Sequence, residues 1–141
     1  MIKVVYWSST GNTEQMAESI VKGIQEAGKE AELLNLSDIS VDDVKDEDVF
    51  ALGCPAMGAE NLEEGEVEPF VTELEQYAAG KTILLFGSYS WGDGQWMRDW
   101  VERLANCGAN ILNNEGFICC ETPSDEVLAQ GEELGKQLAQ I

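Results

Sequence analysis

A cluster of hydroxyl and amide side chains lies near the start of the chain, in the segment Trp7-Ser8-Ser9-Thr10-Gly11-Asn12-Thr13. The apolar run before it, 2–6, is typical of a buried strand, and a run with apolar residues at helical spacing follows it. The cluster therefore occupies a turn that leads into a helix N-terminus, where free backbone N–H groups and the helix dipole attract anions.

The same segment lacks a cation, since no Lys or Arg occurs between Val4 and Lys22. Catalytic phosphoryl transfer needs Lys and Mg²⁺, so this loop favours a phosphate monoester held by neutral donors. An ordinary helix cap is the simpler interpretation, but capping uses only one or two hydroxyl or amide side chains. The loop offers five, so we predict a phosphate site.

Two further loops are rich in Gly and small residues, 53–60 (GCPAMGAE) and 87–94 (GSYSWGDG). With the first segment, they resemble the three flavin-contacting loops of short-chain flavodoxins from anaerobic bacteria, and the resemblance covers essentially the whole chain. The family usually has Gly at position 9, Gly at 90, and Asp, Ser or Asn at 59. The resemblance implies noncovalent FMN bound by Ser8, Ser9, Thr10, Gly11, Asn12, Thr13, Pro55, Ala56, Met57, Gly58, Ala59, Glu60, Ser88, Tyr89, Ser90, Trp91 and Gly92.

The resemblance also implies individual roles. Trp91 would stack on one face of the isoalloxazine ring and Met57 would contact the other. Glu60 would accept a hydrogen bond from flavin N3–H, and the carbonyl of Gly58 would accept one from reduced N5–H. Without the resemblance, each of these residues has a simpler interpretation. Trp91 would be a surface aromatic, Met57 a Met that fills a gap in the core, Glu60 an exposed acid and Gly58 a turn glycine.

Two other tryptophans, Trp96 and Trp100, fall on an apolar helix stripe and are expected in the core. The place of Trp7, over the sheet end or the ribityl chain, stays open. The four cysteines, Cys54, Cys107, Cys119 and Cys120, end apolar runs and are expected as buried or partly buried thiols. Adjacent cysteines on a strand point to opposite faces, which argues against a disulfide between the last two. Without His or a CxxC pair, structural zinc and Cys-His catalysis are not expected.

The chain of 141 residues has a net charge of −19, from 27 acidic and 8 basic residues. This charge excludes nucleic acid as a partner. The charge serves either to attract a basic protein partner or only to keep the protein in solution. The segment 46–80 contains ten acids and no base, which favours the basic partner. No apolar run is long enough to span a membrane and no signal peptide is evident, so we expect no membrane contact and a cytoplasmic protein.

Strand and helix patterns alternate along the chain, which predicts a parallel sheet with helices on both faces. Strands are expected at 2–6, 32–36, 49–54 and 82–87, and a broken fifth at 110–112 and 116–119. Helices are expected at 13–27, from 67 to near 80, through Trp96 to Leu104, and from the N-cap Ser124 to Ile141. The second of these helices is expected to have Tyr77 on its apolar face, and a helical turn is expected at 41–44. The flavodoxin-like arrangement is one doubly wound domain, 1–141, with a five-stranded sheet in the order 2-1-3-4-5. Its ligand would lie at the carboxyl ends of strands one and three.

The resemblance implies a low-potential one-electron carrier that uses the semiquinone/hydroquinone couple of FMN and has no substrate reaction of its own. Its partners would be oxidoreductases that can also use ferredoxin, with basic docking surfaces, and the chain would be a monomer. A quinone or NAD(P)H oxidoreductase of this fold is one alternative, but its site for quinone or nicotinamide would need an insert or a basic residue near the ring, and neither is evident. A phosphate-responsive receiver module is another, but it needs acids after strand one, where the chain has Trp7-Ser8-Ser9.

Overall fold

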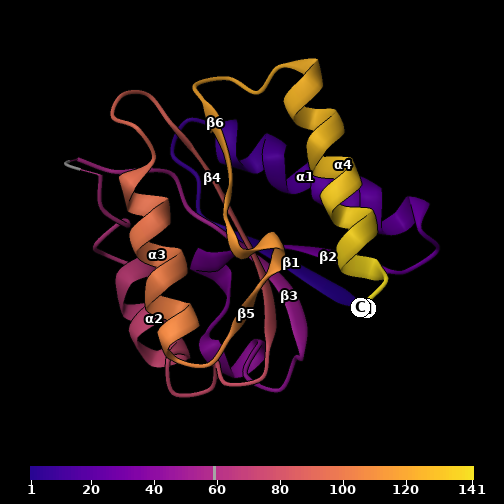
Figure 1. Cartoon of the computed structure of the whole chain (residues 1–141), viewed down its shortest axis with the longest axis horizontal. Helices are drawn as coiled ribbons and strands as arrows, with labels where there is room; N and C mark the ends of the chain where they lie inside the picture. The colour runs from indigo at the N-terminus through magenta and orange to yellow at the C-terminus, as the bar shows by residue number, and fades with distance from the viewer. Residues whose placement is uncertain (59) are drawn as a thin grey trace.

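Six parallel strands form the centre of the computed structural model, which describes residues 1–58 and 60–141. The strands run β2-β1-β3-β4-β5 across the sheet, and β6 also pairs with β4, so the predicted order is confirmed (Figure 1). The last position is shared by two short strands because a 3₁₀ turn, η3 (Leu112–Asn114), interrupts them, with Asn113 in the left-handed region at φ 62°. The strands are β1 (Ile2–Tyr6), β2 (Ala31–Asn35), β3 (Val49–Gly53), β4 (Thr82–Tyr89), β5 (Asn110–Ile111) and β6 (Phe117–Cys120).

Helices cover both faces of the sheet, as predicted (Figure 1). One face carries α1 (Asn12–Glu26) and α4 (Asp125–Ala139), and the other carries α2 (Val67–Leu74) and α3 (Gln95–Asn106). Two 3₁₀ turns, η1 (Leu36–Asp38) and η2 (Val41–Asp43), connect β2 to β3. No helix in 1–58 or 60–141 is both long and apolar enough to cross a membrane.

The two central strands β3 and β4 contribute side chains to two separate hydrophobic cores, one on each face of the sheet. Phe50 and Leu85 belong to the core under α2 and α3, whereas Ala51 and Leu84 belong to the core under α1 and α4. All four side chains are essentially buried. A parallel strand covered on both faces must be apolar at every position, which is why these segments read as unbroken apolar runs.

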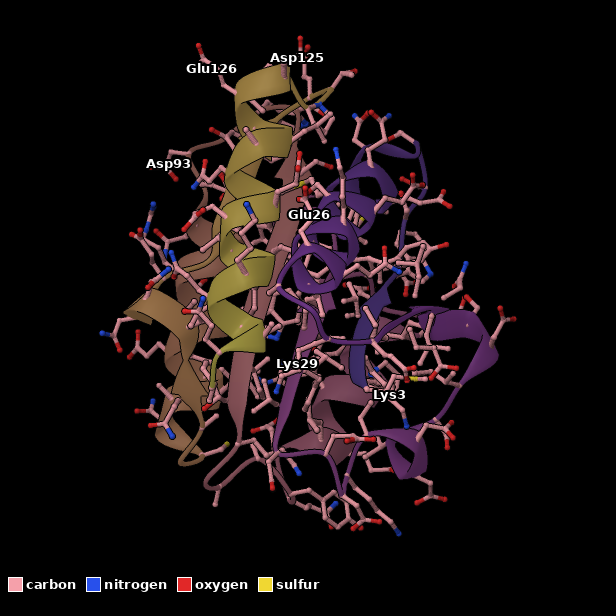
Figure 2. The ribbon with its side chains drawn as sticks, turned by 90° about the vertical axis from the view of Figure 1, so that its right-hand side faces the viewer. Lys3, Glu26, Lys29, Asp93, Asp125 and Glu126 are labelled. Atoms are coloured by element: carbon pink, nitrogen blue, oxygen red, sulfur yellow. The ribbon has the colours of Figure 1, made fainter. Side chains whose placement is uncertain are left out.

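Helices α1 and α4 approach each other closely because glycines form their contact. A Cβ atom at Gly23 would collide with the carbonyl of Glu132, and one at Gly135 would collide with the carbonyl of Ile20. Figure 2 shows the two helices side by side on this face (Figure 2). The packing fixes α1, and with it the position of its N-terminus at the end of β1.

Three predicted details are wrong. Helix α2 ends at Leu74, and Tyr77 lies on an exposed turn where Lys45 Nζ is 5.9 Å from its ring centroid. Ile141 lies beyond the end of α4 and is exposed. Cys120 is exposed although Cys119 is buried, and the two can differ because neighbouring residues of β6 face opposite sides of the sheet.

Candidate functional site

The three predicted loops meet at the carboxyl edge of the sheet, where backbone hydrogen bonds join them. The Trp7 N–H, after β1, donates to the Gly53 carbonyl at 3.0 Å. Beyond β3, the Cys54 N–H donates to Phe86 at 3.0 Å and the Ala56 N–H donates to Ser88 at 3.0 Å. Segments far apart in the sequence therefore form one continuous site, as the topology predicts.

The first loop presents an uncapped helix N-terminus. Gly11 is the N-cap of α1 with φ 92°, and no described side chain accepts a hydrogen bond from the first turn. Ser8 Oγ instead accepts from the Gly11 N–H at 3.1 Å, while the side chains of Ser9 and Thr10 are exposed. Free N–H groups beside exposed hydroxyls suit an anion, so the residues present fit the phosphate of FMN.

Thr13 and Ser88, which were predicted as flavin-loop residues, are bonded to each other. Their hydroxyl oxygens are 3.1 Å apart, and the Ser88 N–H also donates to Thr13 Oγ1 at 3.3 Å. Both residues are buried, and Ser88 belongs to β4 rather than to a loop. Strand β4 runs two residues further than predicted because β6 pairs with it there. The pair fixes the start of α1 against β4, and the predicted contacts of these two residues with FMN would be additional to it.

The second loop forms a tight turn closed by Met57 and Asn61. Their backbones exchange two hydrogen bonds of 2.8 and 2.9 Å. Within the turn, Gly58 has φ 53° and is exposed, and Glu60 has φ 59°. Pro55, another predicted contact, is buried. Ala59 lies outside the described residues.

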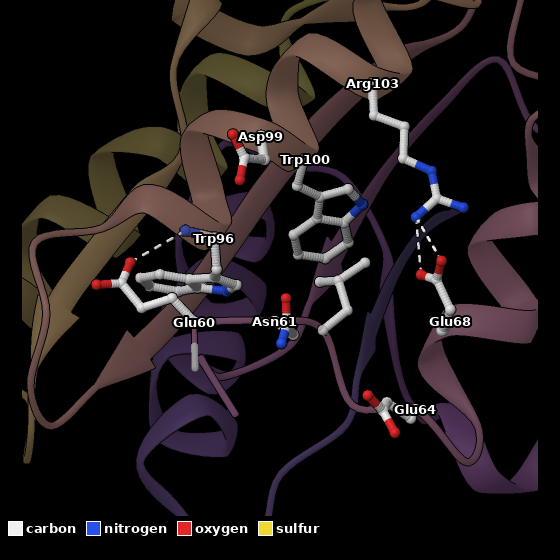
Figure 3. A pocket seen from close by; sticks show the side chains of 9 residues that line it. Glu60, Asn61, Glu64, Glu68, Trp96, Asp99, Trp100 and Arg103 are labelled. Atoms are coloured by element: carbon white, nitrogen blue, oxygen red, sulfur yellow. Dashed lines mark hydrogen bonds and ion pairs between the residues drawn. The ribbon is translucent and has the colours of Figure 1, made fainter. Parts of the chain in front are cut away.

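Glu60 links this turn to the third loop (Figure 3). Its carboxylate accepts from the Asp93 N–H at 2.9 Å and from the Trp96 N–H, in the first turn of α3, at 3.2 Å. Gly92 lies so close that a Cβ there would collide with Glu60 Oε1. The carboxylate thus caps α3 in place of the N-cap residue Gly94, which has no side chain. Its predicted role toward flavin N3–H would be added to this structural one.

The third loop exposes a large aromatic side chain. Trp91 is 70% exposed, between the exposed Ser90 and Gly92. An exposed indole of this size is free to stack on a flat ligand ring. Beneath the loop, Trp96 donates from Nε1 to the Cys54 carbonyl at 3.2 Å and packs against Tyr89 with ring centroids 5.6 Å apart. The prediction that Trp96 belongs to the core is confirmed.

Sequence reasoning missed several acids that organise the edge. The Tyr6 hydroxyl donates to Glu14, in the first turn of α1, at 3.2 Å. Burial raises the pKa of Tyr6, and this hydrogen bond raises it further. Trp7 Nε1 donates to Glu66 at 3.4 Å, which places the Trp7 side chain beside the start of α2. No local pattern pairs these residues, because the contacts join different elements.

Glu63 is the third such acid, and here a signal was available. Its carboxylate accepts from the N–H groups of Gly65, Glu66 and Val67 at 2.6, 2.7 and 3.0 Å, at the start of α2. An acid just before an apolar helical stripe indicates such a cap. Partial burial raises the pKa of Glu63, but the three donors lower it by more, so that the net shift is downward.

Several charged side chains can be placed relative to the two edges of the sheet. Asp93, Asp125 and Glu126 lie toward the carboxyl edge, whereas Lys3 and Lys29 lie toward the opposite edge (Figure 2). Within 1–58 and 60–141, no cluster of three or more acidic, His or Cys side chains is arranged to hold a metal ion. The site is therefore an anion loop and an aromatic surface in acidic surroundings.

Comparison with known proteins agrees with this geometry. The flavodoxin family model matches residues 4–134. The flavodoxin of Clostridium beijerinckii is 48% identical over 99% of this chain and 100% of its own length, and that of Megasphaera elsdenii is 45% identical over 99% and 98%. The solution structure of the two-electron reduced Megasphaera elsdenii flavodoxin superposes with a TM-score of 0.87, at 43% identity over the full length of both chains. The chain therefore belongs to the flavodoxin family, whose members are FMN-binding electron carriers.

Proposed function

We propose that this chain is a low-potential one-electron carrier that shuttles electrons between redox partner proteins through the semiquinone/hydroquinone couple of bound FMN. The whole chain, 1–141, would act as one flavodoxin-like domain, a cytoplasmic monomer without a substrate reaction of its own. The observation that carries the proposal is the convergence of an uncapped helix N-terminus and an exposed Trp91 at one acidic sheet edge. FMN supplies the electron chemistry when bound, and the protein supplies binding and electrostatics.

The proposed contacts use residues that are exposed or partly exposed. Ser8, Ser9, Thr10, Asn12 and the N–H groups at the start of α1 would hold the phosphate. Trp91 would lie on one face of the ring and Met57 on the other, with Gly58 at the ring edge. A Cβ at Gly58 would meet nothing within 4 Å, so open space surrounds this part of the turn.

Acidic surroundings support a low potential. Glu14, Glu64 and Glu66 lie in or beside the loops, and the anion loop itself contains no cation. A negative charge about 10 Å from another, at an effective dielectric constant near 40, costs roughly 0.8 kcal/mol. For one electron this is about 35 mV per charge before screening by salt. Several such acids would lower the potential of the last electron by on the order of 100 mV.

Ligand discrimination tests the site. Fluorescence-quenching titrations should give tighter binding of FMN than of riboflavin, because two charge-assisted hydrogen bonds to phosphate amount to about 3 kcal/mol, or roughly 100-fold. Thr10→Val removes an exposed hydroxyl and should reduce the ratio of the affinity for FMN to the affinity for riboflavin. Thr72→Val, on the exposed surface of α2, should leave this ratio unchanged. Equal affinities for FMN and riboflavin would refute the phosphate assignment.

A reductive titration with redox dyes tests the carrier assignment. Reduction in two separate one-electron steps is expected, with the lower potential well below that of free FMN. Glu64→Gln should raise this lower potential by tens of millivolts at low salt and by less at high salt. A single two-electron step, or bleaching by NAD(P)H without a reductase, would instead favour an oxidoreductase.

A further inference from the structure

Trp96, the second residue of α3, forms hydrogen bonds to both ends of the second loop, 53–60. Near the start of this loop, its Nε1–H donates to the Cys54 carbonyl at 3.2 Å. At the end of the loop, its backbone N–H donates to the Glu60 carboxylate at 3.2 Å (Figure 3). Met57 and Gly58, the ring contacts predicted for this loop, lie between the two bonded residues. One residue of α3 thus anchors the loop on either side of them.

The approach of the indole to the loop depends on a strand residue that has no side chain. A Cβ atom at Gly87, in β4, would collide with the Cys54 carbonyl and lie 3.2 Å from Trp96 Cζ2. On its other side the indole packs against Tyr89, with ring centroids 5.6 Å apart. Strand β4 therefore leaves room for α3 and the second loop to meet, and the indole N–H lies in that space.

Trp100, about one turn later in α3, provides an internal comparison. Both indoles are buried, with 2% of Trp96 and 1% of Trp100 exposed. In the described part of the chain, no group accepts a hydrogen bond from Trp100 Nε1, whereas Trp96 Nε1 has the Cys54 carbonyl. A tryptophan can thus pack in this core with its N–H unbonded. The hydrogen bond of Trp96 is a separate feature, and it acts on the second loop.

We propose that Trp96 is a positioning residue for the flavin ring. Its indole and its backbone N–H keep the two ends of the second loop in place while Met57 and Gly58 contact the ring. This inference rests on the proposed flavin contacts of those two residues. A ligand that binds only the anchored loop has an apparent affinity proportional to the fraction of molecules in which the loop is anchored. Loss of the indole hydrogen bond lowers that fraction.

Flavin affinities distinguish this role from general stabilisation. The second loop serves the ring and the first loop serves the phosphate, so Trp96→Phe should weaken FMN and riboflavin by the same factor, at least threefold, in fluorescence-quenching titrations. Trp100→Phe is the matched control, because it makes the same substitution in the same helix but removes an N–H without a described acceptor. It should leave both affinities unchanged.

Hydrogen exchange in the FMN-free chain gives a second reading that needs no cofactor. The backbone N–H groups of Met57 and Asn61 bond to each other's carbonyls at 2.8 and 2.9 Å, so their exchange with D₂O reports how often the turn opens. Trp96→Phe should speed this exchange at least threefold, and Trp100→Phe should not. The amide of Val5, in the buried strand β1, measures any change in global stability, which is subtracted.

The unmodified chain supplies a third reading, which holds even if Trp96→Phe does not fold. If the indole hydrogen bond favours ring binding, ring binding must favour the bond. Riboflavin should therefore slow the exchange of the Trp96 indole N–H at least threefold more than that of Trp100, the two NMR signals being told apart by the contact of Trp96 with the Tyr89 ring.

Three results would overturn the proposal: equal slowing of the two indole signals, equal effects of Trp96→Phe and Trp100→Phe on flavin affinity, or weakening of FMN alone. Failure of the proposed flavin function is seen separately, because the unmodified chain would then bind neither FMN nor riboflavin.

Discussion

Glu60 offers the sharpest test of how the site is held together. Its two carboxylate oxygens accept from backbone N–H groups of the third loop and of the first turn of α3, at 2.9 and 3.2 Å. In Glu60→Gln the amide keeps one acceptor oxygen and presents an NH₂ group to the second donor. One charge-assisted hydrogen bond is therefore lost and one is weakened. Hydrogen bonds to charged groups are worth about 1.5–3 kcal/mol, so we expect a loss of about 2 kcal/mol.

The assay is urea unfolding of the FMN-free chain, followed by tryptophan fluorescence and circular dichroism. Glu64→Gln is the matched control, because it makes the same change of charge four residues away at an exposed side chain. It should change the free energy of unfolding by less than about 0.5 kcal/mol. If both variants are equally stable, the carboxylate does not cap α3 and the reasoning is refuted.

Gly92 provides an independent check on the same contact. Gly92→Ala should be destabilising for two reasons, since φ is 89° there and the new Cβ would collide with Glu60 Oε1. In a Glu60→Ala background only the strain of the left-handed backbone remains, about 1–2 kcal/mol. The two substitutions should thus be non-additive by at least 1 kcal/mol. Additive effects would mean that Glu60 does not occupy this position.

Other expected outcomes concern packing, ionisation and thiol reactivity. Gly23→Ala should lower the free energy of unfolding by about 1–3 kcal/mol, despite the better helix propensity of Ala, because it forces α1 away from α4; an unchanged urea midpoint would contradict this packing. Glu63→Gln should cost about 1 kcal/mol at pH 7. Because the pKa of Glu63 is lowered in the folded chain, this difference should persist above about pH 5 and shrink in unfolding experiments toward pH 3. With Ellman's reagent, Cys120 should react first, while Cys54, whose pKa burial raises to about 12, should react only on unfolding.

The sequence predicted the architecture well because it is set by patterns within single elements. Central strands such as β3 are apolar throughout, since both faces are covered, and the hydroxyl-rich loop after β1 is a local signal of a helix N-terminus. The helix stripe that contains Trp96 and Trp100 also predicted their burial correctly. Errors arose at ends, where the pattern fades: α2 ends before Tyr77 and β4 extends through Ser88.

The contacts between loops could not be predicted in the same way. The Thr13–Ser88 hydrogen bond joins residues 75 positions apart, and Glu60 reaches the first turn of α3 across 36 positions. Each of these side chains was predicted as a cofactor contact, and its hydrogen-bond partner in another loop was not predicted. Their pairing depends on how β1, β3 and β4 align, and a single sequence records that only indirectly.

These loop contacts explain how Glu60 and Glu63 are held at the acidic edge without an ion pair to any described residue, whereas Asp93 in the third loop is paired with Arg98 at 2.9 Å. Glu60 caps α3 and Glu63 caps α2, so backbone N–H groups and helix dipoles do the work that Lys or Arg side chains would otherwise do. A helix dipole carries only about half a charge at its end, so each carboxylate is held in place without being fully neutralised. The edge keeps most of its negative charge, which a low flavin potential and attraction of a basic partner both require. Replacing either cap by a salt bridge would reduce this negative charge, and it should therefore raise the proposed low potential and weaken the proposed attraction of a basic partner.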